Sequence, residues 1–451
     1  MIFYLFLITI FNTYIINSYE IASLSIQGSR PYQQDRLYVA QNPNDQLIAA
    51  VFDGHGDYGD EVAQVAQKSV PQFFNNIQLT EKNIKATFRS LNNEIYKIVG
   101  PKKTKYSGST GVVLLQDKDN FYIAHCGDSR AVWGKEKHQQ TVDHSAANPS
   151  EIQRVGNKNV KNISGIPRLG GTLMVTRSFG DMALQTIGLT AEPNVVTLPK
   201  KNIAHILLGC DGVFDHTSTK TSENSWYNDK NIGLWNIINN NGLNIQLAAL
   251  RLAAFIIGKD INYYKGNQGF LENLARDNNI DEAYDRTVSQ GMNKQNNLGF
   301  QEKLQVVIDY VTSNSCSQQN LIPFINEFKN ILHDNTTFIV IKNNSIHKNQ
   351  SNNTIYDITA FFDQKNVPKD ITNRNNTTPV ESITHKTVNQ EFKEKLTDNS
   401  SYQSTSNITP DIKAPENNNS LKTQLWYFMS LPFQWLWNGG KSLFSFFYNW
   451  L

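Results

Sequence analysis

The sequence is poor in cysteine, and its charges are almost balanced. Its 451 residues include only Cys126, Cys210 and Cys316, which are too few and too widely spaced for a disulfide scaffold or a cysteine-based zinc site. Their odd number favours a reducing compartment. With 42 Lys and Arg against 40 Asp and Glu, the formal net charge is +2. That balance excludes a strongly basic nucleic-acid-binding protein and an acidic disordered chain.

Apolar residues are also somewhat scarce, and no internal repeat is present. Length alone predicts two to three domains of ordinary size. Counted with Gly in place of Tyr, however, apolar residues make up about 41% of the chain, below the usual ~45–50%. This shortage fits one large globular core that is diluted by polar segments.

The N-terminal segment 1–18 is short and apolar. Residues 2–16 read IFYLFLITIFNTYII, about 15 residues, which is short for a membrane span. The segment lacks a basic first part and a small-residue cleavage site, although a signal peptide or anchor stays open as an interpretation. The alternatives are a strand extension and a misplaced start.

The C-terminal third contains a polar linker and an aromatic tail. Residues 343–420 are rich in Asn, Ser and Thr without apolar periodicity, which predicts a disordered linker. Residues 421–451 contain four of the seven Trp, and Pro432 and Gly439–Gly440 divide them into pieces too short to span a bilayer. Because Trp and Tyr favour the membrane interface, we expect membrane contact there. The alternative is that the tail folds back on the globular part.

Residues 19–342 have the pattern of an α+β domain. Short apolar runs such as QLIAAVFDG at 46–54 predict strands, and helical periodicity marks 60–70, ending before Pro71, and 82–99. Strands grouped around such helices are typical of helices packed on antiparallel sheets. Residues 222–320 read as a helical insertion, and 243–258 as a buried helix within it.

The strongest chemical signal is a series of aspartates at predicted strand ends. Asp53, Asp128, Asp211 and Asp334 each follow or adjoin an apolar run, and Gly follows Asp53 and Asp211. A carboxylate that emerges from a core is costly unless it is paired or binds a metal. One Asp-Gly pair is more often only a turn, but four such sites together predict a centre for Mg²⁺ or Mn²⁺.

Over residues 19–342, the chain resembles the protein phosphatase 2C family of metal-dependent Ser/Thr phosphatases. The matching segments are QGSRPYQQD at 27–35, VFDGHG at 51–56, SGST at 107–110, HCGDSRAV at 125–132, TVDHSAANPSE at 141–151, GGTLMVTRSFGD at 170–181, EPNVV at 192–196, GCDGVFD at 209–215 and HDNTTFIV at 333–340. The resemblance implies a β-sandwich of two antiparallel sheets flanked by helices, with a binuclear metal centre at one end.

The resemblance also implies metal ligands. Asp53 matches the carboxylate that bridges two Mg²⁺ or Mn²⁺ ions, and Gly54 matches the residue whose carbonyl binds one of them. Asp211 and Asp334 match the ligands of the other ion. Asp128 matches a residue that, with Asp211, holds a weaker third ion.

Three further residues match roles around the substrate. Arg30 matches the guanidinium that binds the phosphate, and its planar fork suits that task. His55 matches the general acid that protonates the leaving alkoxide. Asp35 matches a carboxylate that holds a metal-bound water. By this resemblance, metal-bound hydroxide would attack phosphorus in line, without a covalent phosphoenzyme.

The sequence therefore predicts a protein phosphatase with a monomeric catalytic domain, phosphoprotein substrates and no nucleic-acid partner. We expect it in the cytoplasm or on the cytosolic face of a membrane, with secretion as the alternative. Two rival functions stay open: an inactive pseudophosphatase that acts as a scaffold, and a hydrolase of small phosphoesters. Gln34, where eukaryotic relatives often have Glu, predicts weaker binding of the nearby metal.

Overall fold

The structure describes only part of the chain. The chain divides into two units, Met1–Ser382 and Ile383–Leu451. The computed structural model describes residues of the first unit: 19–42, 46–215, 234–239, 244–264, 267, 269, 274, 279–289, 298–311, 313, 316–344 and 354–361. The N-terminal segment 1–18, the tail 421–451 and most of the linker 343–420 lie outside these residues, so the expectations for them stay predictions.

A five-stranded sheet forms one layer, and all its neighbouring strands are antiparallel, in the order β13-β7-β6-β3-β2. Its strands are β2 (Arg36–Gln41), β3 (Leu47–Phe52), β6 (Gly111–Gln116), β7 (Asn120–Cys126) and β13 (Asn194–Pro199).

A six-stranded sheet forms the other layer, in the order β16-β1-β15-β14-β8-β9. Its strands are β1 (Tyr19–Ile26), β8 (Arg130–Gly134), β9 (His138–Gln140), β14 (His205–Gly209), β15 (Thr336–Asn343) and β16 (Thr354–Asp357). Its pairs are antiparallel except β1 with β16, which is parallel. The expected α+β sandwich of antiparallel sheets flanked by helices is confirmed, with β16 as a parallel addition. This strand lies inside 343–420, where we expected a linker without a core.

Strand β3 shows how the sequence builds the two layers. Successive side chains of a strand point to opposite faces. Leu47, Ala49 and Val51 join the core between the two sheets. The alternate residues, Ile48 and Phe52 among them, join a second core under the helices. A continuous apolar run therefore marks a strand that is buried on both faces.

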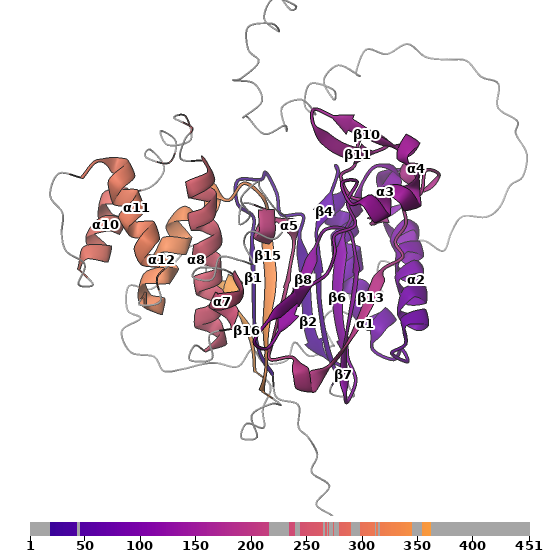
Figure 1. Ribbon diagram of the computed structural model, residues 1–451, viewed down its shortest axis with the longest axis horizontal. Helices are drawn as coiled ribbons and strands as arrows, with labels where there is room; N and C mark the ends of the chain where they lie inside the picture. Colours follow the sequence, from indigo (N-terminus) through magenta and orange to yellow (C-terminus); the bar gives the residue numbers. More distant parts are fainter. Residues whose placement is uncertain are drawn as a thin grey trace, which may run out of the picture. The chain divides into compact units, whose positions relative to one another are not determined.

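Helices α1 (Gly59–Phe74) and α2 (Glu81–Val99) cover the outer face of the five-stranded sheet (Figure 1). Our prediction that the first helix ends before Pro71 is wrong, because α1 continues through Pro71 for another turn. The proline removes one backbone donor, but Val70 and Phe74 are both buried in the core. That burial holds the last turn in place.

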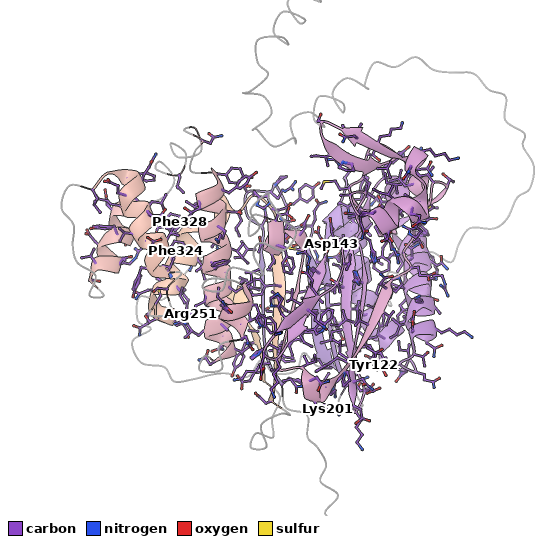
Figure 2. The ribbon with its side chains drawn as sticks, viewed as in Figure 1. Tyr122, Asp143, Lys201, Arg251, Phe324 and Phe328 are labelled. Carbon is purple, nitrogen blue, oxygen red and sulfur yellow. The ribbon has the colours of Figure 1, made fainter. Side chains whose placement is uncertain are left out.

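Helices of the insertion pack against one another beside the other sheet. They are α7 (Leu234–Ile238), α8 (Ile245–Tyr264), α10 (Ile280–Val288), α11 (Phe300–Val311) and α12 (Gln318–Phe328). Helix α8 lies against β1 and β15 (Figure 1), and Figure 2 shows Arg251, Phe324 and Phe328 among these helices. Helical structure thus runs beyond 320, the expected end of the insertion. Among the described helices, none is both long enough and apolar enough to cross a membrane.

Candidate functional site

Five aspartates lie where the chain enters or leaves the central strands. Asp35 precedes β2, Asp53 follows β3, and Asp128 lies between β7 and β8. Asp211 follows β14 and begins the short helix α5 (Asp211–Phe214), and Asp334 lies just before β15. The structure brings these five carboxyl groups close enough together to act on one another electrostatically.

Burial and mutual repulsion both act on this group of carboxylates. Burial raises the pKa of Asp53 well above its ordinary value, and the charges of Asp211, Asp35, Asp334 and Asp128 raise it further. Burial is also the main cause that raises the pKa of Asp211, Asp35 and Asp128. Asp35 is buried and the other four are half-buried. Carboxylates that repel one another in this way form a site that a divalent cation would neutralise.

Asp35 gives a direct test of whether a cation fits here. Its side chain is buried, and within the described part of the chain neither of its carboxyl oxygens has a hydrogen-bond partner. A buried carboxylate without partners is costly unless something else balances its charge. The candidate metal ligands are all oxygen atoms, which suit Mg²⁺ or Mn²⁺. No three His, Cys, Asp or Glu side chains of the described residues are already arranged as a metal site, but the residues present fit such ions.

Gly54 is held so tightly that only glycine fits. A Cβ on this residue would lie 2.5 Å from the carbonyl carbon of Gly59 and 2.8 Å from the carbonyl oxygen of Gln34. The side chain of Gln34 in turn donates to the carbonyl of Gly56 at 2.8 Å. The backbone around Asp53 therefore packs closely against the segment that carries Asp35.

Arg30 lies at the open side of this group. Its Nη2 lies 2.6 Å from Oδ2 of Asp334, and 47% of its side chain is exposed. Burial lowers the pKa of Arg30, but the negative charges of Asp334 and its neighbours outweigh that effect and raise it. The guanidinium thus stays charged beside the carboxylates, with part of its surface open to solvent.

Asn335 links the segments that carry these residues. Its Nδ2 donates to the carbonyl of Gln27 at 2.8 Å, and its Oδ1 accepts the backbone N–H of Gln34 at 2.8 Å. Its own N–H donates to Oδ1 of Asp334 at 2.7 Å. Sequence reasoning gave Asn335 no role, although it stands directly after a predicted ligand.

His55 pairs with an aspartate that sequence reasoning also missed. A small sheet joins β4 (Gly54–His55), β5 (Gly108–Ser109) and β12 (Phe179–Gly180). It places Nε2 of His55 2.7 Å from Oδ2 of Asp181. Asp181 is buried and has a left-handed backbone with φ of 49°, and Ser178 donates to the same oxygen at 2.6 Å. The signal available in the sequence was the end of the matching segment 170–181, whose last residue is Asp181.

The pair changes the protonation of His55. Burial lowers the pKa of the imidazole, but the charge and hydrogen bond of Asp181, with the charge of Asp128, outweigh it and raise the pKa. His55 therefore holds its proton more firmly than an ordinary histidine, and the charge of Asp128 acts on it. All eight residues that the sequence predicted for the site thus meet at this end of the sandwich.

Ion pairs connect chain segments close to the predicted ligands. Arg130 donates to Asp143 (labelled in Figure 2) at 3.0 Å through Nε, and its guanidinium lies over the ring of Phe214 in α5. Glu151 is buried and accepts hydrogen bonds from both Arg154 and Arg177. These pairs fix the loops on either side of the predicted ligands.

The cysteines next to the site are not reactive thiols. Cys126 and Cys210 are buried, and burial raises the pKa of Cys126 to about 12 and that of Cys210 well above its ordinary value. The backbone N–H of Thr337 donates to the sulfur of Cys210 at 3.2 Å. Both residues act as small packed side chains.

Comparison with known proteins points to one family. The family model "Protein phosphatase 2C" matches residues 22–222. "Probable protein phosphatase 2C 44" of Oryza sativa subsp. japonica is 31% identical over 42% of this chain and 62% of its own length. "Probable protein phosphatase 2C 17" of Arabidopsis thaliana is 32% identical over 42% of this chain and 70% of its own length. The match to the family model ends where the expected insertion begins.

One solved structure is similar over a larger share of the chain, but only weakly. It is "Crystal structure of serine-threonine phosphatase 2C from Toxoplasma gondii", with a TM-score of 0.42, 18% identity and coverage of 72% of this chain and 94% of that chain. The sequence matches, and not this likeness, identify the family.

Proposed function

This chain belongs to the protein phosphatase 2C family of metal-dependent protein serine/threonine phosphatases, and on that basis we propose that it hydrolyses phosphoserine and phosphothreonine in proteins. The observation that carries the proposal is the group of mutually repelling, buried and half-buried carboxylates beside Arg30. Such a group next to an exposed guanidinium suits a phosphate that arrives together with divalent cations.

Oxygen atoms of five residues would hold the ions. We propose that Asp53 and the carbonyl of Gly54 bind one of two Mg²⁺ or Mn²⁺ ions, with Asp53 shared, and that Asp211 and Asp334 bind the other. Asp128 with Asp211 would hold a weaker third ion. When bound, such ions lower the pKa of water and so supply a nucleophile near neutral pH.

Asp35 would orient a water molecule at the site and would not bind a metal ion itself. Its buried oxygens lack partners among the described residues, so they are available to accept hydrogen bonds from water at the site. A buried acceptor that orients a water restricts the directions from which that water reacts. We propose this orienting role for Asp35.

Arg30 would bind the phosphate of the substrate. A guanidinium donates two parallel hydrogen bonds to phosphate oxygens. In the free protein this fork is held against Asp334, which keeps it at the edge of the carboxylate group. Binding of the phosphate would share this cation between Asp334 and the substrate and would balance charge on the phosphoryl oxygens.

His55 would supply the proton that the leaving group needs. A serine or threonine alkoxide is a poor leaving group and requires a general acid. Because Asp181 accepts from Nε2 of the protonated ring, Nδ1–H is the donor that would face the leaving oxygen. The raised pKa of His55 lets the ring keep this proton to higher pH than an ordinary histidine would.

The test is phosphate release by the full chain from a phosphothreonine peptide, with Mn²⁺ and with EDTA. We expect turnover of the peptide that depends on Mn²⁺ and exceeds turnover of p-nitrophenyl phosphate. Turnover of the small ester alone would favour the small-substrate rival. A folded protein that turns over neither would favour the scaffold function.

For the compartment, we propose the cytosol or the cytosolic face of a membrane. Support comes from the three cysteines, all free, and from the aromatic composition of 421–451. Cell fractionation of the full chain and of a chain without 421–451 tests the membrane contact. An unchanged distribution between the two fractions would contradict it.

A further inference from the structure

Helix α8 of the insertion carries a buried carboxylate where its sequence is otherwise apolar. Fourteen of its residues are buried, among them the run Leu252–Gly258. Asp260 lies two positions after this run, with only 2% of its surface exposed. A buried carboxylate is stable only with strong partners. Its partners therefore show what this part of the insertion is built to hold.

Asp260 bonds to His333, the residue immediately before Asp334. Oδ2 of Asp260 accepts the backbone N–H of His333 at 2.9 Å and lies 2.9 Å from its Nδ1. On its other side, Nε2 of His333 lies 3.9 Å from Oδ2 of Asp215, at the end of α5. One imidazole thus connects the insertion to the two segments that carry Asp334 and Asp211.

The same loop is held from the opposite side by residues 28–30. The N–H of Ser29 donates to the carbonyl of Leu332 at 2.8 Å, and Arg30 pairs with Asp334 at 2.6 Å. Gly28 is so close that a Cβ there would lie 2.6 Å from the carbonyl oxygens of Leu332 and Asp334. The contacts of His333 and those of residues 28–30 therefore hold the loop from two sides.

Helix α8 provides a rigid base for this contact. It lies against β1 and β15, and β15 begins two residues after Asp334. Its side chains Leu252, Phe255 and Ile256 belong to the same core as the six-stranded sheet. Moving Asp260 away from the loop would therefore disturb packed apolar side chains, which is energetically unfavourable.

We propose that the insertion is a positioning element of the metal centre, in which Asp260 holds His333 and thereby fixes the backbone that presents Asp334. The inference rests on the proposed function, because it takes Asp334 as a metal ligand. Asp260 is a positioning residue and touches no reacting atom. Partners that orient metal ligands typically contribute about 10- to 100-fold to metal affinity.

The experiment measures the affinity of the full chain for Mn²⁺ alone, from the electron paramagnetic resonance signal of free Mn²⁺. Asp260→Ala is compared with Asp281→Ala, a matched change at an exposed position of the same insertion. We expect Asp260→Ala to weaken Mn²⁺ binding about 10-fold and Asp281→Ala to leave it unchanged. In the background of His333→Ala, Asp260→Ala should add little, since Asp260 acts through His333.

The outcomes separate the inference from the function on which it rests. Mn²⁺ binding by folded Asp260→Ala that equals wild type would overturn the inference, as would full additivity of the two substitutions. If Asp260→Ala does not fold, His333→Ala takes its place with the same expected weakening, and unchanged affinity overturns the inference. Wild-type protein that binds no Mn²⁺ would instead overturn the proposed function.

Discussion

Nε2 of His55 lies 2.7 Å from Oδ2 of Asp181, although 126 positions separate the two residues in the chain. Ser178 donates to the same carboxyl oxygen, and the N–H of Asp181 donates to the carbonyl of Ser107. Asp181 is thus fixed by its own loop and by a neighbouring one before it meets His55. The surrounding loops therefore hold the His55–Asp181 pair in place.

Replacing Asp181 with Asn should move the pH dependence of turnover. Asn tolerates the left-handed backbone, so the loop should keep its shape while the negative charge is lost. A general acid works only while protonated, and Asp181 raises the pKa of His55. We therefore expect the alkaline limb of the kcat–pH profile to shift to lower pH in Asp181→Asn. The matched control is Asp119→Asn, at an exposed turn.

A lower kcat in Asp181→Asn with an alkaline limb at the wild-type pH would contradict this account. Such a result would mean that Asp181 supports the fold of the loop but does not tune the proton of His55. Urea unfolding of both variants checks that they are folded in the pH range of the assay.

Glu151, which accepts hydrogen bonds from two arginines, should contribute strongly to the stability of the fold. Burial raises the pKa of Glu151, but hydrogen bonds from Arg177, Arg154 and Thr176 outweigh it and hold the pKa well below its ordinary value. Removing one partner of a buried ion pair typically costs about 3–5 kcal/mol. We expect Glu151→Gln to lower the free energy of unfolding by about 3 kcal/mol, measured in urea. The exposed control Glu136→Gln should change it by less than about 0.5 kcal/mol.

A buried histidine pair should make the protein sensitive to acid. His144 stacks on His125 at 4.4 Å, and burial, then the neighbouring His125 and Arg177, lowers the pKa of His144 to about 2. The unfolded chain takes up this proton near pH 6.5. Stability from neutral His144 is therefore present above about pH 6.5 and is lost as pH falls below it, by up to about 1.4 kcal/mol per pH unit.

The variant His144→Phe tests whether His144 makes the protein less stable as pH falls. It keeps an aromatic ring against His125 and cannot take up a proton. Between pH 6.5 and pH 4.5, its free energy of unfolding should fall less steeply than that of the wild type. Parallel curves for the two proteins would contradict the prediction.

Much of the site follows from the sequence because local order determines it. A strand end fixes the place of the next residue, so the aspartates after the apolar runs at β3 and β14 could be recognised, as could the sheets themselves. Asp181, Asn335 and His333 could not be recognised in this way. Their partners come from remote segments, and only the packing of loops brings them together.

Two of the local differences have physical causes of the same kind. Pro71 was expected to end α1, but burial of Phe74 extends the helix. Residues 354–357 were expected within a linker, because a short Asn-flanked run has little apolar pattern, yet they pair with β1. An edge of an existing sheet can order a short strand that has no strong preference of its own.

The aromatic core under the helices should tolerate little change. Phe88 is buried in α2, stacks on Phe179 at 5.4 Å and meets Phe74 at 5.9 Å. We expect Phe88→Ala to lower the free energy of unfolding by about 3–5 kcal/mol. Ile98→Ala, at a position of the same helix that is 42% exposed, should cost far less, and equal losses would contradict the packing described.

The most direct test of the metal-dependent function is phosphate release from a phosphothreonine peptide by Asp211→Asn in the full chain, measured across Mn²⁺ concentrations. Asp211 is one of the half-buried carboxylates of the site and repels Asp53 and Asp334, and Asn keeps its shape while removing its charge. We expect Mn²⁺-dependent turnover in the wild type and in Asp119→Asn, and none in folded Asp211→Asn. Turnover by Asp211→Asn that equals wild type at the same Mn²⁺ concentration would contradict the account.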